Sequence, residues 1–214
     1  MSRSTPPPPP LSYQTPGTPA ERFTHAQYLV RKKVLKIFGA AFHVYDTAGN
    51  VVLYSKQKAF KLKEDIRLYT GEDMTVELLT IQARQVIDFG ASYDVYDTPA
   101  QKKIGAFRRM GLKSLIRDEW VIMDAYDREV GRILEDSTTL AVIRRFIEAA
   151  AMFLPQKFHA ELAAGGVVAN FQQNYNPFVR KLTVDFSADT AGRFDRRMGL
   201  AAGILLAAIE GRQG

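Results

Sequence analysis

The end of the chain contains an apolar run that has no polar face. Residues 198–209 are all apolar or small, and charged residues flank them on both sides. A helix that is apolar all round must be buried in protein or lipid. At roughly 1.5 Å per residue such a run spans only about 18 Å, whereas a membrane crossing needs about 20 residues. The run therefore predicts a helix buried inside a protein core.

The composition limits the class of protein. The 214 residues are 46% hydrophobic, which is enough for one good-sized core. The chain has no cysteine, so disulfides, thiolate metal sites and thiol nucleophiles are excluded together. No segment reaches transmembrane length and no signal-like start precedes an apolar run. We expect a cytoplasmic protein with one folded domain.

Positive charge is concentrated in the middle of the chain. Residues 31–117 contain 16 Lys and Arg against 9 Asp and Glu, whereas residues 118–214 contain 11 against 13. This asymmetry favours a polyanionic partner such as a phospholipid surface, a nucleic acid or an acidic protein. Solubility is the alternative explanation for the same charge.

The N-terminal part differs in composition from the rest. Residues 1–22 contain the run Pro6 to Pro10 with Ser, Thr and Gly around it, which predicts a disordered or polyproline II tail. This tail is either a solvated tether or a segment that docks a protein partner with an aromatic-lined groove. Residues 23–214 form the predicted folded domain.

A strand that runs into an Asp-led turn recurs along the chain. The turns begin at Asp46, Asp97 and Asp124. Asp at a turn start can accept a hydrogen bond from the backbone two residues on, which explains its recurrence. The strand pairs around these turns, with a looser fourth copy, are 42–45 and 51–54, 93–97 and 103–107, 120–123 and 130–134, and 167–171 and 181–186.

A series of hairpins must close or stack to hide its edges. The economical architecture is therefore a mainly β fold, in which a β-barrel of antiparallel hairpins encloses the apolar C-terminal helix. Gly199, Ala202 and Gly203 would keep that helix slim where strands approach it. A second helix, capped by Ser137 and ended by Pro155, is expected to pack outside the sheet.

Several segments of this chain resemble the LURP-one-related family, which shares a superfamily with the tubby C-terminal domain and the phospholipid scramblases. The resemblance covers residues 25–213 and rests on many weak matches in the same order, at residues 117–120, 135–146, 154–158 and 184–197. It implies about twelve strands around a hydrophobic C-terminal helix. Tubby domains bind phosphoinositide head groups through basic residues outside the barrel, so the resemblance also implies a module that binds anionic lipid.

The scramblases also place an acidic, calcium-binding segment before the final helix. Here that region offers only Asp185, Asp189 and Asp195, which are spread over eleven residues. A tight calcium site normally needs about six to eight oxygen ligands. We therefore expect no metal site.

The residues that usually mark an enzyme are also missing from the sequence. His25, His43 and His159 lie far apart, and no glycine-rich phosphate loop or Gly-x-Ser-x-Gly elbow occurs. The densest acidic group, Asp124 to Glu129, falls on a predicted turn. We expect a non-enzymatic protein with no catalytic residue and no cofactor.

The basic residues are the candidate ligand-binding residues. Lys56 and Lys58, and again Lys61 and Lys63, lie two residues apart, and alternate residues of a strand share one face. We therefore expect a row of ammonium groups that can meet several phosphates. A second expected cluster consists of Lys102, Lys103, Arg108, Arg109 and Lys113.

The leading hypothesis is a binding module whose basic outer face engages anionic phospholipid head groups at a membrane surface, or an acidic partner. Each basic residue near an anionic membrane contributes about 1 kcal/mol. The alternatives are an edge strand that its lysines protect against aggregation, a structural or interaction subunit of a larger assembly and, third, a phospholipid scramblase. Nucleic acid is a weaker partner because no recognition helix or stacking platform is evident.

Overall fold

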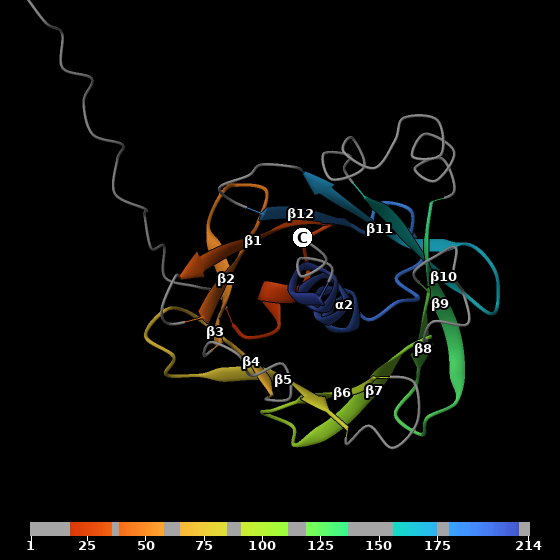
Figure 1. Ribbon diagram of the computed structural model, residues 1–214, viewed down its shortest axis with the longest axis horizontal. Helices are drawn as coiled ribbons and strands as arrows, with labels where there is room; N and C mark the ends of the chain where they lie inside the picture. Colours follow the sequence, from red (N-terminus) through yellow and green to blue (C-terminus); the bar gives the residue numbers. More distant parts are fainter. Residues whose placement is uncertain are drawn as a thin grey trace, which may run out of the picture.

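The computed structural model describes residues 18–35, 39–57, 65–84, 91–110, 119–136, 156–174 and 180–209. Twelve antiparallel strands close into a barrel with one helix inside (Figure 1). A short 3-10 helix, η1 (Glu21–Phe23), precedes the first strand. The strands are β1 (Gln27–Leu35), β2 (Gly39–Tyr45), β3 (Val51–Gln57), β4 (Ile66–Tyr69), β5 (Glu77–Ala83), β6 (Ser92–Asp97), β7 (Lys102–Arg109), β8 (Glu119–Met123), β9 (Glu129–Glu135), β10 (Lys157–Leu162), β11 (Val167–Asn174) and β12 (Arg180–Asp185).

Each strand pairs with its neighbour in the sequence, and the barrel is closed by the pairing of β1 with β12. In that pairing Val30 lies opposite Leu182, and Arg31 lies opposite Lys181. Closure leaves no free sheet edge, which is the usual way in which a meander avoids edge-to-edge aggregation. The predicted mainly β fold, a barrel that encloses a hydrophobic helix, is confirmed.

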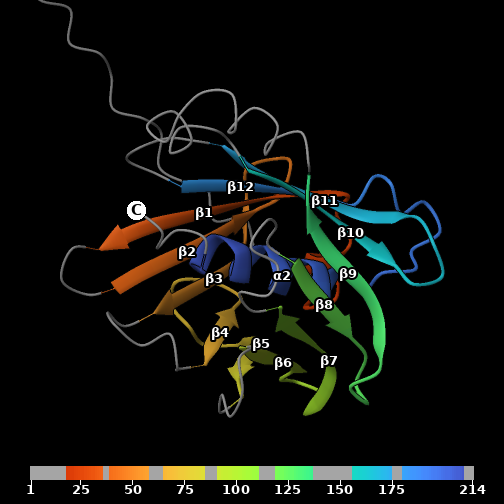
Figure 2. The same cartoon turned by 45° about the vertical axis from the view of Figure 1, so that its right-hand side comes forward.

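The helix α2 (Arg196–Ile209) runs through the interior of the barrel (Figure 2). Residues 198–208 of α2 are buried, as are the inward-facing residues of the strands around them. A Cβ built on Gly203 would lie 2.7 Å from Val184 Cγ2, and one built on Gly199 would overlap the Phe186 ring. Small residues at these positions therefore let β12 approach the helix, as the sequence predicts.

Both ends of α2 are held by side chains. At its start, the Asp195 carboxylate accepts a hydrogen bond from the Arg197 backbone N–H at 2.9 Å, which makes Asp195 an N-cap. At its other end, Lys32 Nζ donates to the carbonyls of Ala207 and Ala208 at 3.2 and 3.3 Å. A lysine at a helix C-terminus satisfies free carbonyls and opposes the negative end of the helix dipole.

The carboxylate of each Asp-led turn accepts a backbone hydrogen bond; at Asp124 it comes from two residues on, as expected, whereas at Asp46 and Asp97 it comes from four and three residues on. Asp46 Oδ1 accepts from the Asn50 N–H at 2.8 Å, Asp97 Oδ1 from Ala100 N–H at 3.1 Å, and Asp124 Oδ1 from Tyr126 N–H at 2.8 Å. In all three hairpins the carboxylate fixes the turn that the sequence pattern predicts.

The predicted outer helix between Ser137 and Pro155 lies outside the described residues. Arg22, at the end of the predicted tail, is buried and donates to the carbonyls of Val52 and Thr70 at 2.6 and 2.9 Å. Within the part of the chain that the structure describes, α2 included, no helix is long and apolar enough to span a membrane.

Candidate anion-binding surface

The outer face of β12 and β1 carries basic side chains because of strand alternation. Val30 and Leu182 are fully buried and face α2, so their neighbours Arg31 and Lys181 face outward. These two cations lie directly opposite each other across the β1–β12 pair. Like charges directly opposite on one face of a sheet are destabilising, so strand pairing does not account for these two cations.

The same outer row continues onto the neighbouring strands. Asn174 of β11 lies opposite Lys181, and His43 of β2 lies opposite Arg31. Neighbouring strands are about 4.8 Å apart, so these four side chains line up over about 14 Å. In the next row Lys33 and Lys56 stand on either side of Ala41. We call Arg31, Lys33, Lys56 and Lys181 the basic wall.

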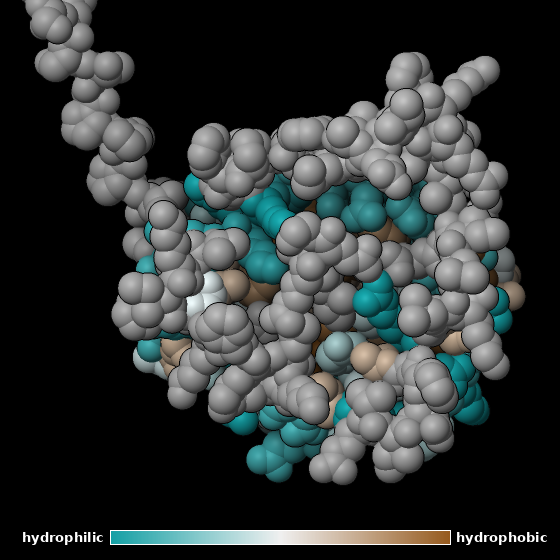
Figure 3. Space-filling model, viewed as in Figure 1, coloured by the Kyte–Doolittle hydropathy of each residue, from teal (hydrophilic) through white to brown (hydrophobic). Residues whose placement is uncertain are grey.

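The charges of the basic wall are not neutralised. Arg31, Lys33 and Lys56 are exposed and Lys181 is half-buried. None of the four has an ion pair with a carboxylate of the described residues. Figure 3, in the same view as Figure 1, shows hydrophilic side chains gathered over β1, β12 and β11. A surface that is rich in donors and has no neighbouring acid is suited to an anionic ligand.

The first acidic residue next to this row is Glu72, which contacts His43. His43 Nε2 lies 2.6 Å from Glu72 Oε1, and the His43 ring packs against Tyr54 with 5.0 Å between centroids. Partial burial and the nearby Glu72 charge raise the pKa of the Tyr54 hydroxyl. The histidine and its acid partner therefore end this row before β3, whereas Lys56 of β3 belongs to the next row.

The row of lysines predicted from the sequence is described only in part. β3 ends at Gln57, so Lys56 is the one residue of that row on the strand. Lys58, Lys61 and Lys63 lie outside the described residues, as does Lys113 of the second cluster.

The structure does not bring the second predicted cluster together. Lys102 and Lys103 begin β7 and Arg108 and Arg109 end it, so the two pairs lie at opposite ends of the strand. Alternation also separates the members of each pair. Lys102 and Arg108 are exposed, whereas Arg109 lies over the Trp120 ring, 5.9 Å from its centroid.

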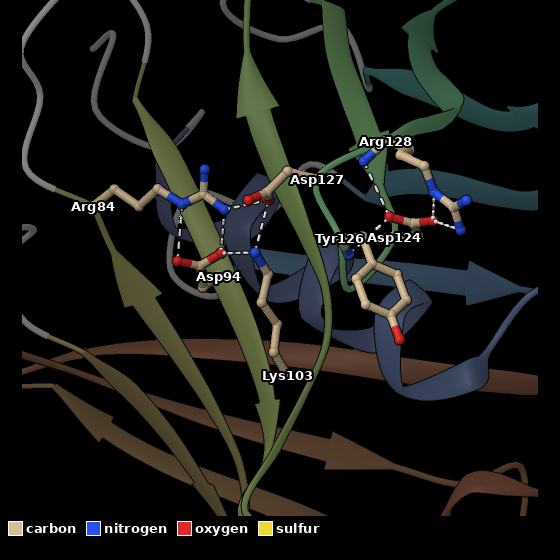
Figure 4. Close-up of polar contacts among 7 residues, drawn as sticks. All are labelled: Arg84, Asp94, Lys103, Asp124, Tyr126, Asp127 and Arg128. Carbon is tan, nitrogen blue, oxygen red and sulfur yellow. Dashed lines mark hydrogen bonds and ion pairs between the residues drawn. The ribbon is translucent and has the colours of Figure 1, made fainter.

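Lys103 belongs to a neutral network of two cations and two carboxylates (Figure 4). Its Nζ lies 2.8 Å from Asp94 Oδ1 and 2.7 Å from Asp127 Oδ1. Arg84 binds the same two carboxylates from the end of β5. Asp127 has a φ of 63°, in the left-handed region, and the network holds this residue in place. Lys103 therefore ties the β8–β9 hairpin to the barrel wall and is not available to a ligand.

This network predicts a loss of stability in acid. Partial burial alone would raise the pKa of Asp94, but hydrogen bonds from Arg84 and Lys103 outweigh it and hold that pKa below its ordinary value. Hydrogen bonds from Lys103 and Arg84 also lower the pKa of Asp127. Stabilisation by a carboxylate with a lowered pKa is fully present above its ordinary pKa of about 4 and disappears as the pH falls through the folded value.

Asp94→Asn should therefore unfold more easily than the natural protein at pH 7. The difference should shrink as the pH falls below about 4, where the natural protein loses the same interaction. Urea unfolding at a series of pH values measures this difference. A difference that stays constant down to pH 2 would show that Asp94 acts through packing rather than through charge.

The remaining candidates for chemistry are occupied by structural contacts. His159 Nδ1 lies 2.6 Å from Asp136, and His25 packs edge-on against Tyr28. Within the described ranges no group of three or more His, Cys, Asp or Glu could hold a metal ion. The acidic residues before α2 cap the local backbone, since Asp185 accepts from the Ser187 N–H and Asp189 from the Arg193 N–H.

Sequence reasoning missed three members of the basic wall, Arg31, Lys33 and Lys181. Arg31 and Lys33 lie two residues apart in the sequence, and this alternation is the signal that could have identified them. Lys181 is 150 residues from Arg31, and only the closing pairing of β1 with β12 brings them together.

Comparison with known proteins does not assign a family. No protein-family profile matches the chain, and no curated protein gives a significant match. Among solved structures, the X-ray structure of the Arabidopsis thaliana protein AT5G01750 aligns with a TM-score of 0.49 at 12% identity, over 91% of this chain and 97% of that chain. The resemblance to the LURP-one-related family therefore stays a prediction.

Proposed function

We propose that this protein is a non-enzymatic binding module that engages anionic phospholipid head groups through its basic wall. The observation that carries the proposal is the row of uncompensated donors across β11, β12 and β1, in which Asn174, Lys181 and Arg31 lie side by side. Phosphate oxygens are acceptors that such a row can meet at several points. The resemblance to a superfamily with lipid-binding members agrees with this ligand.

The expected strength is that of a reversible peripheral membrane protein. Each basic residue close to an anionic bilayer contributes about 1 kcal/mol, so the four residues of the basic wall contribute about 4 kcal/mol together. That corresponds to roughly a thousandfold preference for anionic over neutral lipid. A protein of this kind is cytoplasmic and associates with the inner surface of a membrane for part of the time.

Vesicle binding tests the proposal. The purified protein should co-sediment with vesicles that contain phosphatidylserine or a phosphoinositide. It should stay in the supernatant when the vesicles contain only neutral phosphatidylcholine. Binding should weaken strongly between about 0.05 and 0.15 M salt, because the attraction is screened over about 8 to 14 Å in this range. Equal binding to neutral and anionic vesicles would contradict the proposal.

An interaction subunit of a larger assembly is the second candidate, and one surface feature favours it. Tyr126, at the tip of the β8–β9 hairpin, has 80% of its surface exposed and lies under the Arg128 guanidinium (Figure 4). The turn is fixed by Asp124, which accepts hydrogen bonds from the backbone N–H groups of both residues. A rigid, exposed Tyr–Arg pair is typical of protein contacts, and loss of a partner by Tyr126→Ser in a pull-down would support this role.

A further inference from the structure

A histidine and a glutamate lie in contact at the edge of the basic wall. His43 of β2 is directly opposite Arg31 of β1, and the Cβ atoms of such a pair are about 5 Å apart. His43 Nε2 lies 2.6 Å from Oε1 of Glu72, which belongs to the turn between β4 and β5. The pair is therefore next to the cations that the proposed function assigns to phospholipid.

The groups that face His43 come from three neighbouring elements and from its own strand. Arg31 of β1 is charged at every pH of interest. Tyr54 of β3 packs against the His43 ring, and partial burial raises the pKa of its hydroxyl, so it stays neutral. Tyr45 on β2 stacks on the ring at 6.1 Å, and Glu72 supplies the carboxylate. Histidine is the side chain of this set whose charge ordinarily changes between about pH 8 and 5.

The proton on His43 sets how much negative charge lies beside the wall. When His43 is neutral, the Glu72 carboxylate keeps its full charge and repels phosphate groups. It is one side chain away from Arg31, so screening over about 8 Å at physiological salt weakens this repulsion without removing it. When His43 is protonated, imidazolium and carboxylate form an ion pair with no net charge. The local charge of the surface then rises by one unit.

The pair is open to solvent, so its protonation can follow the pH. The Glu72 side chain has 49% of its surface exposed and the His43 side chain 13%. His159 makes a similar contact, 2.6 Å from Asp136, but it lies on β10. In the strand register His159 is two strands and four residues from Lys181, which is about 16 Å or twice the screening length. His43 is therefore the histidine placed to affect the basic wall.

We propose that protonation of His43 strengthens the binding of the basic wall to anionic phospholipid, so that the protein binds membranes more tightly at pH 5.5 than at pH 7.5. The proposal rests on the function proposed above and adds its regulation by pH. One unit of charge near an anionic bilayer corresponds to about a 5-fold change in binding. Because linkage is reciprocal, an anionic bilayer favours the protonation of His43 by the same factor.

Two histidine variants form a matched pair for the test. Partition of His43→Gln and of His159→Gln onto phosphatidylserine vesicles is measured at pH 7.5 and at pH 5.5. Gln can still bond to the neighbouring carboxylate but carries no charge at either pH. The gain in binding at pH 5.5 should be about 5-fold smaller for His43→Gln than for His159→Gln. Any change in the lipid itself affects both variants equally.

Glu72→Gln tests the same account at a single pH. Removing the carboxylate should strengthen vesicle binding at pH 7.5 by about 5-fold, as protonation of His43 does. Glu129→Gln is the control, because Glu129 is also exposed and paired, with Arg132, but lies on β9, four strands from β1 around the barrel. The control should change binding by less than about 2-fold.

The outcomes separate the two proposals. If His43→Gln keeps the same gain at pH 5.5 as His159→Gln, the pH switch is wrong. If Glu72→Gln and Glu129→Gln strengthen binding equally, only net charge matters and the switch is again wrong. If the natural protein binds anionic vesicles at neither pH, the proposed function itself fails.

Discussion

Gly199→Val should lower the free energy of unfolding by about 3 kcal/mol or more, at the upper end of what overpacking a core costs. A Cβ at this position would overlap the Phe186 ring, and Phe194 Cε1 lies 3.2 Å from it on another side. Phe186 is almost fully buried and contacts the rings of Tyr28 and Phe194. The substitution therefore has to displace α2 inside the barrel.

Whether the smaller change Gly199→Ala raises or lowers the free energy of unfolding is equally diagnostic. In an exposed helix, alanine is more favourable than glycine by about 0.8 to 1 kcal/mol. Here the steric overlap should exceed that gain, so the variant should be less stable than the natural protein. Gly71→Ala is the control, because its Cβ would make only an ordinary contact, 3.4 Å from Asp73 Oδ1. Urea unfolding that showed Gly199→Ala to be more stable would place α2 elsewhere.

Asp189→Ala should destabilise the protein by about 3 to 5 kcal/mol, the range for breaking a buried charged network by removing one partner. The Asp189 side chain is fully buried and accepts the backbone N–H groups of Arg193 and Phe194, both at 2.9 Å. The Arg196 guanidinium lies 3.8 Å from the same carboxylate and 4.5 Å from the centre of the Phe186 ring. Removing the carboxylate leaves buried donors without an acceptor just before α2 begins.

Asp195→Ala is the matched control for this prediction. Asp195 also accepts a backbone N–H, but it is more exposed, and its partner Arg197 retains Asp97. Loss of such an N-cap costs about 1 kcal/mol. Thermal or urea unfolding of the two variants should therefore show a clearly larger loss for Asp189→Ala. Equal losses would mean that the buried network adds nothing to simple capping.

The sequence predicts the central features of this fold because their causes are local. The apolar run that becomes α2 admits no exposed face, and the Asp-led turns carry their own hydrogen-bond acceptor. The closure of the barrel is different, since β1 and β12 lie at opposite ends of the domain. No local pattern identifies which distant strands pair, and here the twelve-strand count came from a family resemblance.

The candidate surface is harder to predict than the fold. Lys103 and Arg108 look alike in sequence, yet Lys103 is neutralised by Asp94 and Asp127 whereas Arg108 has no acid partner among the described residues. The difference depends on which strands meet and on the direction in which each side chain points. A count of charges therefore predicts that a basic surface exists, but not which residues form it.

The measurement that tests the central claim most directly compares two triple charge reversals on phosphatidylserine vesicles. One variant changes Arg31, Lys33 and Lys181 of the basic wall to Glu, and the other changes Arg67, Lys102 and Arg128, which lie outside it. Both alter the net charge by the same amount. The basic wall account predicts that the first loses at least about 100-fold in vesicle binding and the second less than about 5-fold. Equal losses, or unchanged binding by the first, would contradict the account.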